Sequence, residues 1–263
     1  MDLGLKGRVA IVAAASTGLG RAVARELSKE GANVAICART GETLRKTAEE
    51  IQRETGVEVL QKTADVRNEA EISSFVAAVE SRFGRVDICV TNSGGPPSKF
   101  FADTRTEEWR SAIDLLLLST VHFARETLPR MQKNHWGRFI TITSYAAKQP
   151  VDGLLLSNSV RSAVTGLAKT LASEYARYGI TVNNVCPGYT ATDRLGELSE
   201  TVAARNNVSV NDVVEGWKRQ IPAGRLGTPE EFAAVVAFLA SERASYVNGT
   251  SIAIDGGIVR GLI

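Results

Sequence analysis

The sequence has few of the residues that form disulfides or bind metals. Its 263 residues include three cysteines, Cys37, Cys89 and Cys186, and two histidines, His122 and His135. Each cysteine lies inside an apolar run, which predicts buried, reduced thiols and a reducing, cytoplasmic setting. With so few histidines, the sequence predicts no structural or catalytic metal site.

Long apolar segments and an excess of one charge are also absent. No apolar run approaches the roughly 20 residues that a membrane-spanning helix needs, and the N-terminus lacks a charged-then-apolar leader. The net charge is only +2, and no long block of like charge occurs. These absences predict a soluble protein that binds neither nucleic acid nor a membrane. A small molecule is therefore the expected partner.

Short apolar runs alternate with segments of helical spacing along the whole chain. Apolar residues make up 44% of the sequence, enough for a substantial core. The segment Arg21–Gly31 carries its apolar residues on one helical face and ends at a glycine typical of a left-handed C-cap. The strand-like runs are residues 8–13, 33–38, 57–63, 86–91, 137–143, 180–186 and 250–255.

Strands that alternate with amphipathic helices indicate a parallel sheet covered on both faces, whose strands are apolar throughout. We therefore predict an α/β fold: one doubly wound, Rossmann-type domain of about seven strands over residues 1–263. Residues 190–227 interrupt the alternation with a polar, helix-prone segment. The sequence predicts a helical lid there, inserted before the last crossover helix.

The loop after the first predicted strand has the composition of a phosphate-binding turn. In an open parallel sheet, ligands bind beyond the carboxyl ends of the strands, where the strand order reverses. The stretch AAASTGLG at residues 13–20 runs directly into a helix, so a pyrophosphate can approach the backbone and the helix start. The alternative is that the two glycines serve only a tight turn. The cofactor contacts predicted here are Ser16, Thr17, Gly18, Leu19 and Gly20.

Polar residues follow the next strands at the same edge of the sheet. Arg39 ends the second strand, and Asp65 and Val66 follow the third. An acid at the position of Arg39 would bind the adenosine ribose, whereas an arginine favours a 2′-phosphate, so the sequence predicts NADP over NAD. The alternatives are a solvated surface arginine for Arg39 and a helix N-cap for Asp65. The other predicted cofactor contacts are Asn92, Ser93, Gly94, Pro187 and Gly188.

These motifs resemble the short-chain dehydrogenase/reductase family, in particular its 3-oxoacyl-acyl-carrier-protein reductases. The resemblance covers about residues 5 to 257. It implies hydride transfer between a nicotinamide cofactor and a carbonyl or alcohol substrate, carried by an asparagine, a serine, and a tyrosine and a lysine four residues apart. The motifs that carry it are AAASTGLGRAVA, the aspartate of ADV, TNSGG, GRFITITS, GITVNNVCPGYTATD, and RLGTPEEFAAVVAFLAS with SIAIDGG.

The chain departs from the family pattern at the residues that carry the reaction. The family serine is Ser144, but the tyrosine position holds Ser157 and the lysine position holds Arg161. Leu116 stands at the asparagine position, and Ala14 replaces the first glycine. A serine hydroxyl is a far weaker acid than a phenol and is shorter by a ring, and a guanidinium stays protonated. We therefore expect Ser157 only to donate a hydrogen bond, and Arg161 to hold ribose hydroxyls without relaying a proton.

Three other side chains near these strand ends are candidates for the missing proton donor: Tyr145, Lys148 and Tyr189. Neighbouring residues at a strand end point in opposite directions, which counts against Tyr145 beside Ser144. The alternatives are that Tyr145 is a packed aromatic under the lid and that Ser144 bonds its own backbone.

The substrate pocket and the subunit contacts have weaker signals. The residues Pro96, Pro97, Phe100 and Phe101, together with the lid, predict an apolar-lined pocket. Helices around residues 106–133 and 153–178 are richer in apolar residues than one sheet face requires, and the tail IVRGLI is apolar at its end. Both features favour contacts between subunits, and the family resemblance implies a homodimer or homotetramer.

Three functional hypotheses follow. The first is an NADP-linked oxidoreductase, for which a 3-oxoacyl compound is one substrate class that the resemblance implies. The second is a dinucleotide-binding sensor or a structural partner of an active relative, because the usual tyrosine and lysine are missing. The third is an enzyme similar to the halohydrin dehalogenases, which carry arginine at the position of Arg161. Those enzymes lack the cofactor loop, whereas this chain keeps Gly18 and Gly20, so the third hypothesis ranks last.

Overall fold

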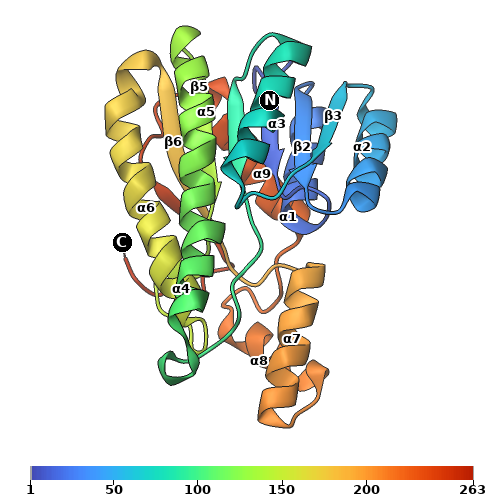
Figure 1. Cartoon of the computed structure of the whole chain (residues 1–263). Coiled ribbons are helices and arrows are strands. Elements are labelled where there is room, and N and C mark those ends of the chain that lie inside the picture. Colours follow the sequence, from blue (N-terminus) through green and yellow to red (C-terminus); the bar gives the residue numbers. More distant parts are fainter. Residues whose placement is uncertain (1, 263) are drawn as a thin grey trace.

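The predicted strands form one parallel sheet. In the computed structural model, which describes residues 2–262, the strand order is β3-β2-β1-β4-β5-β6-β7 (Figure 1). Residues 1 and 263, the ends of the predicted domain, lie outside the described range. The order reverses between β1 and β4, which confirms the doubly wound fold. The strands are β1 Val9–Ala13, β2 Asn33–Ala38, β3 Val59–Thr63, β4 Ile88–Thr91, β5 Gly137–Ile142, β6 Ile180–Pro187 and β7 Ser251–Ile254.

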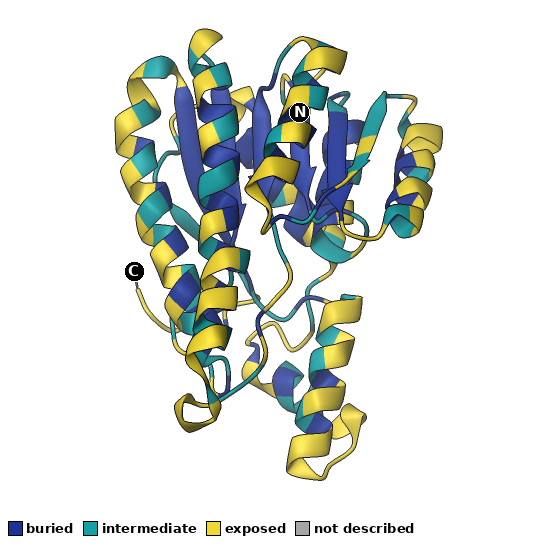
Figure 2. Cartoon of the chain, viewed as in Figure 1, coloured by how far each residue is buried: buried dark blue, intermediate teal, exposed yellow. Residues whose placement is uncertain are grey.

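Helices cover both faces of the sheet. On β1, Ala10 and Val12 pack in the same cluster as α1, α2 and α9, whereas Val9, Ile11 and Ala13 pack with α3, α5 and α6. Successive strand residues thus enter two separate cores, which is why the central strands β1, β2 and β4 are largely apolar and buried on both faces, whereas the edge strands β3 and β7 are partly exposed (Figure 2). The helices are α1 Gly18–Lys29, α2 Gly41–Thr55, α3 Glu69–Phe83, α4 Thr106–Ile113, α5 Ser119–Lys133, α6 Leu155–Tyr175, α7 Asp193–Asn206, α8 Val210–Gln220 and α9 Pro229–Ala240.

The helix predicted over residues 106–133 is interrupted. Between α4 and α5, Asp114–Leu118 (η2) forms a π-helical turn. The hydroxyl of Ser119 donates to the Leu115 carbonyl at 2.6 Å, and that of Thr120 to the Leu116 carbonyl at 3.0 Å. These side chains compete with the backbone for its carbonyls, a pattern that bends helices. The remaining short turns are 3₁₀ helices: η1 Phe101–Asp103, η3 Tyr145–Ala147, η4 Ala176–Tyr178 and η5 Glu242–Ala244.

The segment predicted as a lid contains α7 and α8, which lie below the sheet in Figure 1. The two helices pack on each other through Ala203, Val213 and Trp217. Helix α1 starts earlier than predicted, at Gly18, and Gly31 after it has the expected left-handed backbone, with a φ of +84°. Across residues 2–262, no helix combines the length and apolarity needed to cross a membrane.

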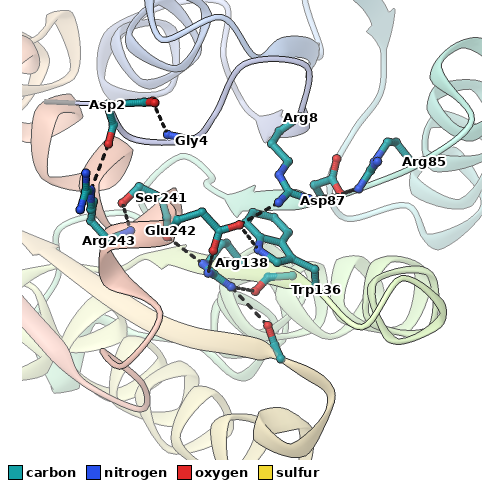
Figure 3. A network of polar contacts seen from close by, with 12 residues as sticks. Asp2, Gly4, Arg8, Arg85, Asp87, Trp136, Arg138, Ser241, Glu242 and Arg243 are labelled. Carbon is teal, nitrogen blue, oxygen red and sulfur yellow. Dashed lines mark hydrogen bonds and ion pairs between the residues drawn. The ribbon is translucent and has the colours of Figure 1, made fainter.

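An ionic network holds the amino ends of the central strands together (Figure 3). Asp87, just before β4, is fully buried and accepts hydrogen bonds from the Val9 backbone N at 2.9 Å and from Arg85 Nη2 at 2.6 Å. Arg8 Nη1 lies 3.7 Å from the same carboxylate, and Arg8 Nη2 donates to Glu242 at 2.8 Å. The network therefore links β1, β4 and η5, the turn that follows α9.

Trp136 completes the network as a platform for two cations. The guanidinium of Arg8 lies 3.7 Å from the centre of the Trp136 ring, and that of Arg138 lies 4.3 Å from it. The indole Nε1 donates to Glu242 at 2.8 Å. Cation–π contacts of this kind compensate part of the cost of burying Arg138.

Replacing Asp87 by asparagine tests how much this network contributes to the free energy of unfolding. We expect Asp87→Asn to lower the free energy of unfolding by about 2 kcal/mol, because the buried carboxylate accepts charge-assisted hydrogen bonds that an amide makes less well. Urea unfolding measures the change. Asp103→Asn, at an exposed aspartate in η1, is the control. A stability equal to that of the wild type for Asp87→Asn would contradict the expectation.

Candidate functional site

A cleft of about 530 Å³ opens at the carboxyl ends of β1 to β6. All predicted site residues line it except Gly20, which lies behind the first turn. They come from separate loops, which the parallel sheet brings to one edge. The predicted residues that line the cleft are Ser16, Thr17, Gly18, Leu19, Arg39, Asp65, Val66, Asn92, Ser93, Gly94, Ser144, Ser157, Arg161, Pro187 and Gly188.

The first turn is shaped for close approach to the start of α1. A Cβ on Gly20 would lie 2.4 Å from the Ala14 carbonyl oxygen, so only glycine fits there. Gly18 has a φ of +56°, in the left-handed region that glycine favours. Thr17, the N-cap of α1, makes no side-chain capping bond, and the first helical residues, Gly18 and Leu19, line the cleft. This arrangement fits an anionic diphosphate.

Ala14 adopts a backbone conformation that its side chain disfavours. Its φ is +48°, in the left-handed region, where the family pattern has glycine. Two contacts hold the turn in place: Asn92 Nδ2 donates to the Ala14 carbonyl at 3.3 Å, and the Ala15 backbone N donates to the Cys37 carbonyl at 3.1 Å. The turn therefore stores strain that the neighbouring strand ends compensate.

The end of the cleft that follows β2 and β3 carries two arginines and an acid. Arg39 is exposed, and no ion pair to it occurs within residues 2–262. Asp65 pairs with Arg67 at 2.6 Å, and hydrogen bonds from Arg67 hold the pKa of the Asp65 carboxyl below its usual value. The N-cap of α3 is Asn68, which accepts from the backbone N of residues 70 and 71. The alternative role of Asp65 as a helix cap is therefore wrong.

Two serines, Ser144 and Ser157, line the cleft, and the hydroxyl oxygen of each accepts a hydrogen bond from the protein. Ser144 Oγ accepts from the Ala146 backbone N at 3.1 Å, at the start of η3. Ser157, buried in the first turns of α6, accepts from Arg161 Nε at 3.2 Å, and the two side chains, four residues apart, share a helix face. Each hydroxyl hydrogen is thus free to donate to a third group.

Arg161 ties three segments together. Besides Ser157, its guanidinium donates to the carbonyls of Ile142 at 3.2 Å and Thr143 at 2.9 Å, and to that of Gly94 at 3.5 Å. These four bonds leave one of the five guanidinium N–H groups for a ligand. Burial lowers the pKa of Arg161 to about 10, so the group stays charged at neutral pH.

The structure corrects the expectation that Tyr145 points away from Ser144. Strand β5 ends at Ile142, so Tyr145 opens a 3₁₀ turn and does not continue the strand, and both side chains line the cleft. The rings of Tyr145 and Tyr189 lie 5.6 Å apart, and Tyr189 stacks on Trp217 at 4.7 Å. Burial raises the pKa of both phenols. Tyr145 packs with Ile221 and Ile258, so it is also the packed aromatic named as the alternative.

The remaining candidate positions offer no proton route. Lys148 follows η3 as its C-cap and is not among the residues that line the cleft. Leu116 packs with Ala112, Leu156 and Val160, and the space between Leu116 and Arg161 has a volume of about 10 Å³. That volume is at the lower limit for a single water molecule.

A second cavity of about 670 Å³, only partly anticipated by the sequence, adjoins the cleft. It shares four residues with the cleft: Tyr145, Leu154, Tyr189 and Leu198. Of the four residues expected to form an apolar pocket, Phe100 lines this cavity and Pro96 lines the cleft. Pro97 lines neither of them, and Phe101 is 76% exposed.

The wall of this second cavity is of mixed character, which corrects the prediction of an apolar lining. Trp217 and Val202 come from the lid helices α8 and α7, and the sequence did not indicate them because this segment is polar overall. The polar and charged residues of the wall are Ser98, Gln149, Asp152, Arg205, Asn206, Gln220 and Arg260.

The cysteines and histidines take no part in the cleft. Cys37, Cys89 and Cys186 are free and buried. Within the described part of the chain, no group of three or more His, Cys, Asp or Glu residues is arranged to hold a metal ion.

The strained turn gives a stability prediction. Ala14→Gly should raise the free energy of unfolding by about 1 kcal/mol, because glycine adopts a φ of +48° without the clash of a Cβ. Ala15→Gly, at the next, buried alanine, should instead lower it by about 0.5–1 kcal/mol through the entropy of the unfolded chain. Thermal or urea unfolding compares the two. Equal destabilisation by both substitutions would rule out strain at Ala14.

Comparisons with known proteins agree with this architecture. Residues 13–259 match the family described as enoyl-(acyl carrier protein) reductase. The 3-oxoacyl-acyl-carrier-protein reductase of Aquifex aeolicus is 32% identical over 258 residues, which cover 98% of this chain and 100% of that protein. L-sorbose reductase from Gluconobacter frateurii, solved with NADPH and L-sorbose, superposes with a TM-score of 0.95 at 31% identity over 100% of both chains.

An actinorhodin polyketide ketoreductase variant solved with NADPH is similar as well, with a TM-score of 0.93 and 35% identity over 97% of this chain and 98% of the other. The matches span nearly the whole chain and agree with the motifs around the cleft. The chain therefore belongs to the short-chain dehydrogenase/reductase family of NAD(P)-dependent oxidoreductases and resembles its 3-oxoacyl-acyl-carrier-protein reductases.

Proposed function

We propose that this protein is an NADP-linked reductase of a carbonyl substrate, in which Ser157 and Arg161 stand in for the usual tyrosine and lysine. The observation that carries the proposal is the pair of serine hydroxyls at the cleft. Ser144 and Ser157 each accept a hydrogen bond from the protein, so each can donate its hydrogen to one carbonyl oxygen. Two such donors stabilise the negative charge that develops on that oxygen.

The cleft fits the proposed cofactor. The uncapped start of α1 and the close approach allowed by Gly20 suit the diphosphate, and the exposed Arg39 suits a 2′-phosphate. Asp65 and Val66 would hold the adenine end, and Pro187 and Gly188 the nicotinamide end. Two similar structures are described as NADPH complexes, which supports the same choice.

The reaction follows from what each residue can do. A reduced nicotinamide supplies the hydride when it is bound. Ser144 and Ser157 bind the carbonyl oxygen, and the guanidinium of Arg161, bonded to Ser157, strengthens that hydroxyl as a donor. The second cavity holds the rest of the substrate. From the relatives' names, a 3-oxoacyl-like compound is the substrate class that we propose first.

The second candidate function is a dinucleotide-binding sensor or structural partner. It is favoured by Arg161, whose N–H groups are mostly committed to backbone carbonyls, as in a structural tether. We also propose a cytoplasmic homodimer or homotetramer. Ile113 and Leu118, both in the α4–α5 segment, are partly exposed, and Tyr246 is fully exposed, as expected for subunit contacts.

Cofactor titration tests the proposal and its preference for NADP. Fluorescence titration should show tighter binding of NADPH than of NADH, and Arg39→Ala should weaken NADPH binding about 10–100-fold, the worth of one charge-assisted contact. NADH binding should change by less than about threefold. Arg53→Ala, at an exposed arginine near the end of α2, is the control and should leave both affinities unchanged. Equal loss of NADPH and NADH binding by Arg39→Ala would contradict a 2′-phosphate contact.

Serine substitutions test the proposed oxyanion site. Ser144→Ala and Ser157→Ala should each lower kcat for ketone reduction by about 10²-fold, as the loss of an oxyanion donor does. NADPH affinity should stay within about threefold, because the hydroxyls act on the substrate. Ser162→Ala, at an exposed serine of α6, is the control. A wild type that binds NADPH but reduces no member of a ketone panel would favour the sensor instead.

A further inference from the structure

We infer that the paired phenols of Tyr145 and Tyr189 supply the proton that completes carbonyl reduction, in place of the tyrosine that Ser157 replaces. The inference rests on the proposed function, because it names the acid of that same reaction. The two residues come from η3 and from the loop after β6, so neither belongs to the helix that carries the usual acid.

The phenols stand where the two cavities meet. Tyr145 and Tyr189 line both the cleft and the second cavity, together with Leu154 and Leu198. Among the shared residues only the tyrosines carry an exchangeable side-chain proton. A substrate whose body occupies the second cavity and whose carbonyl reaches Ser144 therefore passes beside both rings.

Other proton sources around the carbonyl are unsuitable. The hydroxyls of Ser144 and Ser157 are aliphatic alcohols like the product, so proton transfer from them to the alkoxide has no driving force. Arg161 keeps its charge, and its N–H groups are largely engaged. Behind Arg161, Leu116 leaves room for at most one water molecule, so no water chain reaches the site from that side.

Packing fixes the two phenols. Tyr189 is stacked on Trp217 of α8 with an angle of 13° between the rings, and Tyr145 is buried, with 6% of its surface exposed, against Ile221 and Ile258. The two rings are tilted toward one another at 5.6 Å. Side chains held this way lose little entropy when the substrate arrives, which suits a proton donor.

The proton balance is complete. Hydride adds to the carbonyl carbon and breaks the C=O π bond, and the oxygen takes the proton as the phenolic O–H bond breaks and the alcohol O–H bond forms. The phenolate then regains a proton from water in the open cleft. An alkoxide is more basic than a phenolate, so this transfer stays downhill, although burial raises the pKa of both tyrosines and narrows the difference.

The test compares Tyr145→Phe, Tyr189→Phe and the double substitution, which keep both rings and the Trp217 stack. We expect the double variant to lose about 10²-fold or more in kcat for ketone reduction, the usual worth of a general acid. NADPH affinity should stay within about threefold of the wild type. Tyr178→Phe, at a tyrosine that follows α6 and lines neither cavity, is the control and should leave kcat unchanged.

Two readouts separate proton donation from packing. In cofactor-free protein, an ultraviolet titration should find two phenols that ionise above the usual tyrosine range, and the double variant should lack both. Because an acid works while protonated and both pKa values are raised, wild-type kcat should be level between about pH 6 and 9. The charge of Asp255 contributes to the raised pKa of Tyr145, and the charged residues that line the second cavity together with both rings are Asp152, Arg205 and Arg260.

The outcomes distinguish the inference from the proposed function. If the wild type reduces ketones and the double variant keeps its kcat within about threefold, the tyrosines are not the acid, whereas the reductase function stands. A wild-type kcat that falls with an apparent pKa near neutrality would also overturn the inference. If the wild type binds NADPH and reduces no ketone, both the function and the inference are wrong.

Discussion

The hydrogen bonds of the Arg161 guanidinium hold the functional edge of this protein in place. They connect α6, through Ser157, with the carboxyl end of β5 and with the loop after β4. A lysine has one nitrogen and could not reach the same set of acceptors in a fixed fork. At the position where the family resemblance implies a proton-relaying lysine, we therefore propose a structural role for Arg161. Arg161 fixes the two segments that border the proposed carbonyl site.

In the proposed reductase, the proton donor therefore has to come from elsewhere. With Arg161 committed to backbone carbonyls and Leu116 packed in an apolar cluster, α6 no longer opens onto a route for protons. Ionisable groups remain on the lid side of the cleft, where Tyr189 stacks on Trp217 of α8. The lid thus combines two tasks, the enclosure of the second cavity and the support of a phenol.

The sequence predicts the features that depend on its periodic pattern, namely the strands and the edge of the sheet where ligands bind. It does not predict the features that depend on the conformation of a single turn. Apolar runs located every strand, and the rule that ligands bind at the carboxyl ends placed the residues from Ser16 to Gly188 around one cleft. The direction of Tyr145 could not be predicted, since it depends on β5 ending at Ile142 and on the 3₁₀ turn that follows. Trp217 was missed because its helix is polar overall, and its contact with Tyr189 exists only in the fold.

The two edges of the sheet divide stability and function between them. At the amino edge, Asp87 and Glu242 pair with three arginines, Arg8, Arg85 and Arg138, and two of these arginines lie over Trp136. This network joins β1, β4, β5 and η5. At the carboxyl edge, the first turn holds Ala14 in a left-handed conformation and leaves the start of α1 uncapped. Both features cost free energy in the empty protein, and both suit an anionic ligand that would occupy those N–H groups. A tightly bonded amino edge lets the opposite edge remain strained and open without loosening the strands between them.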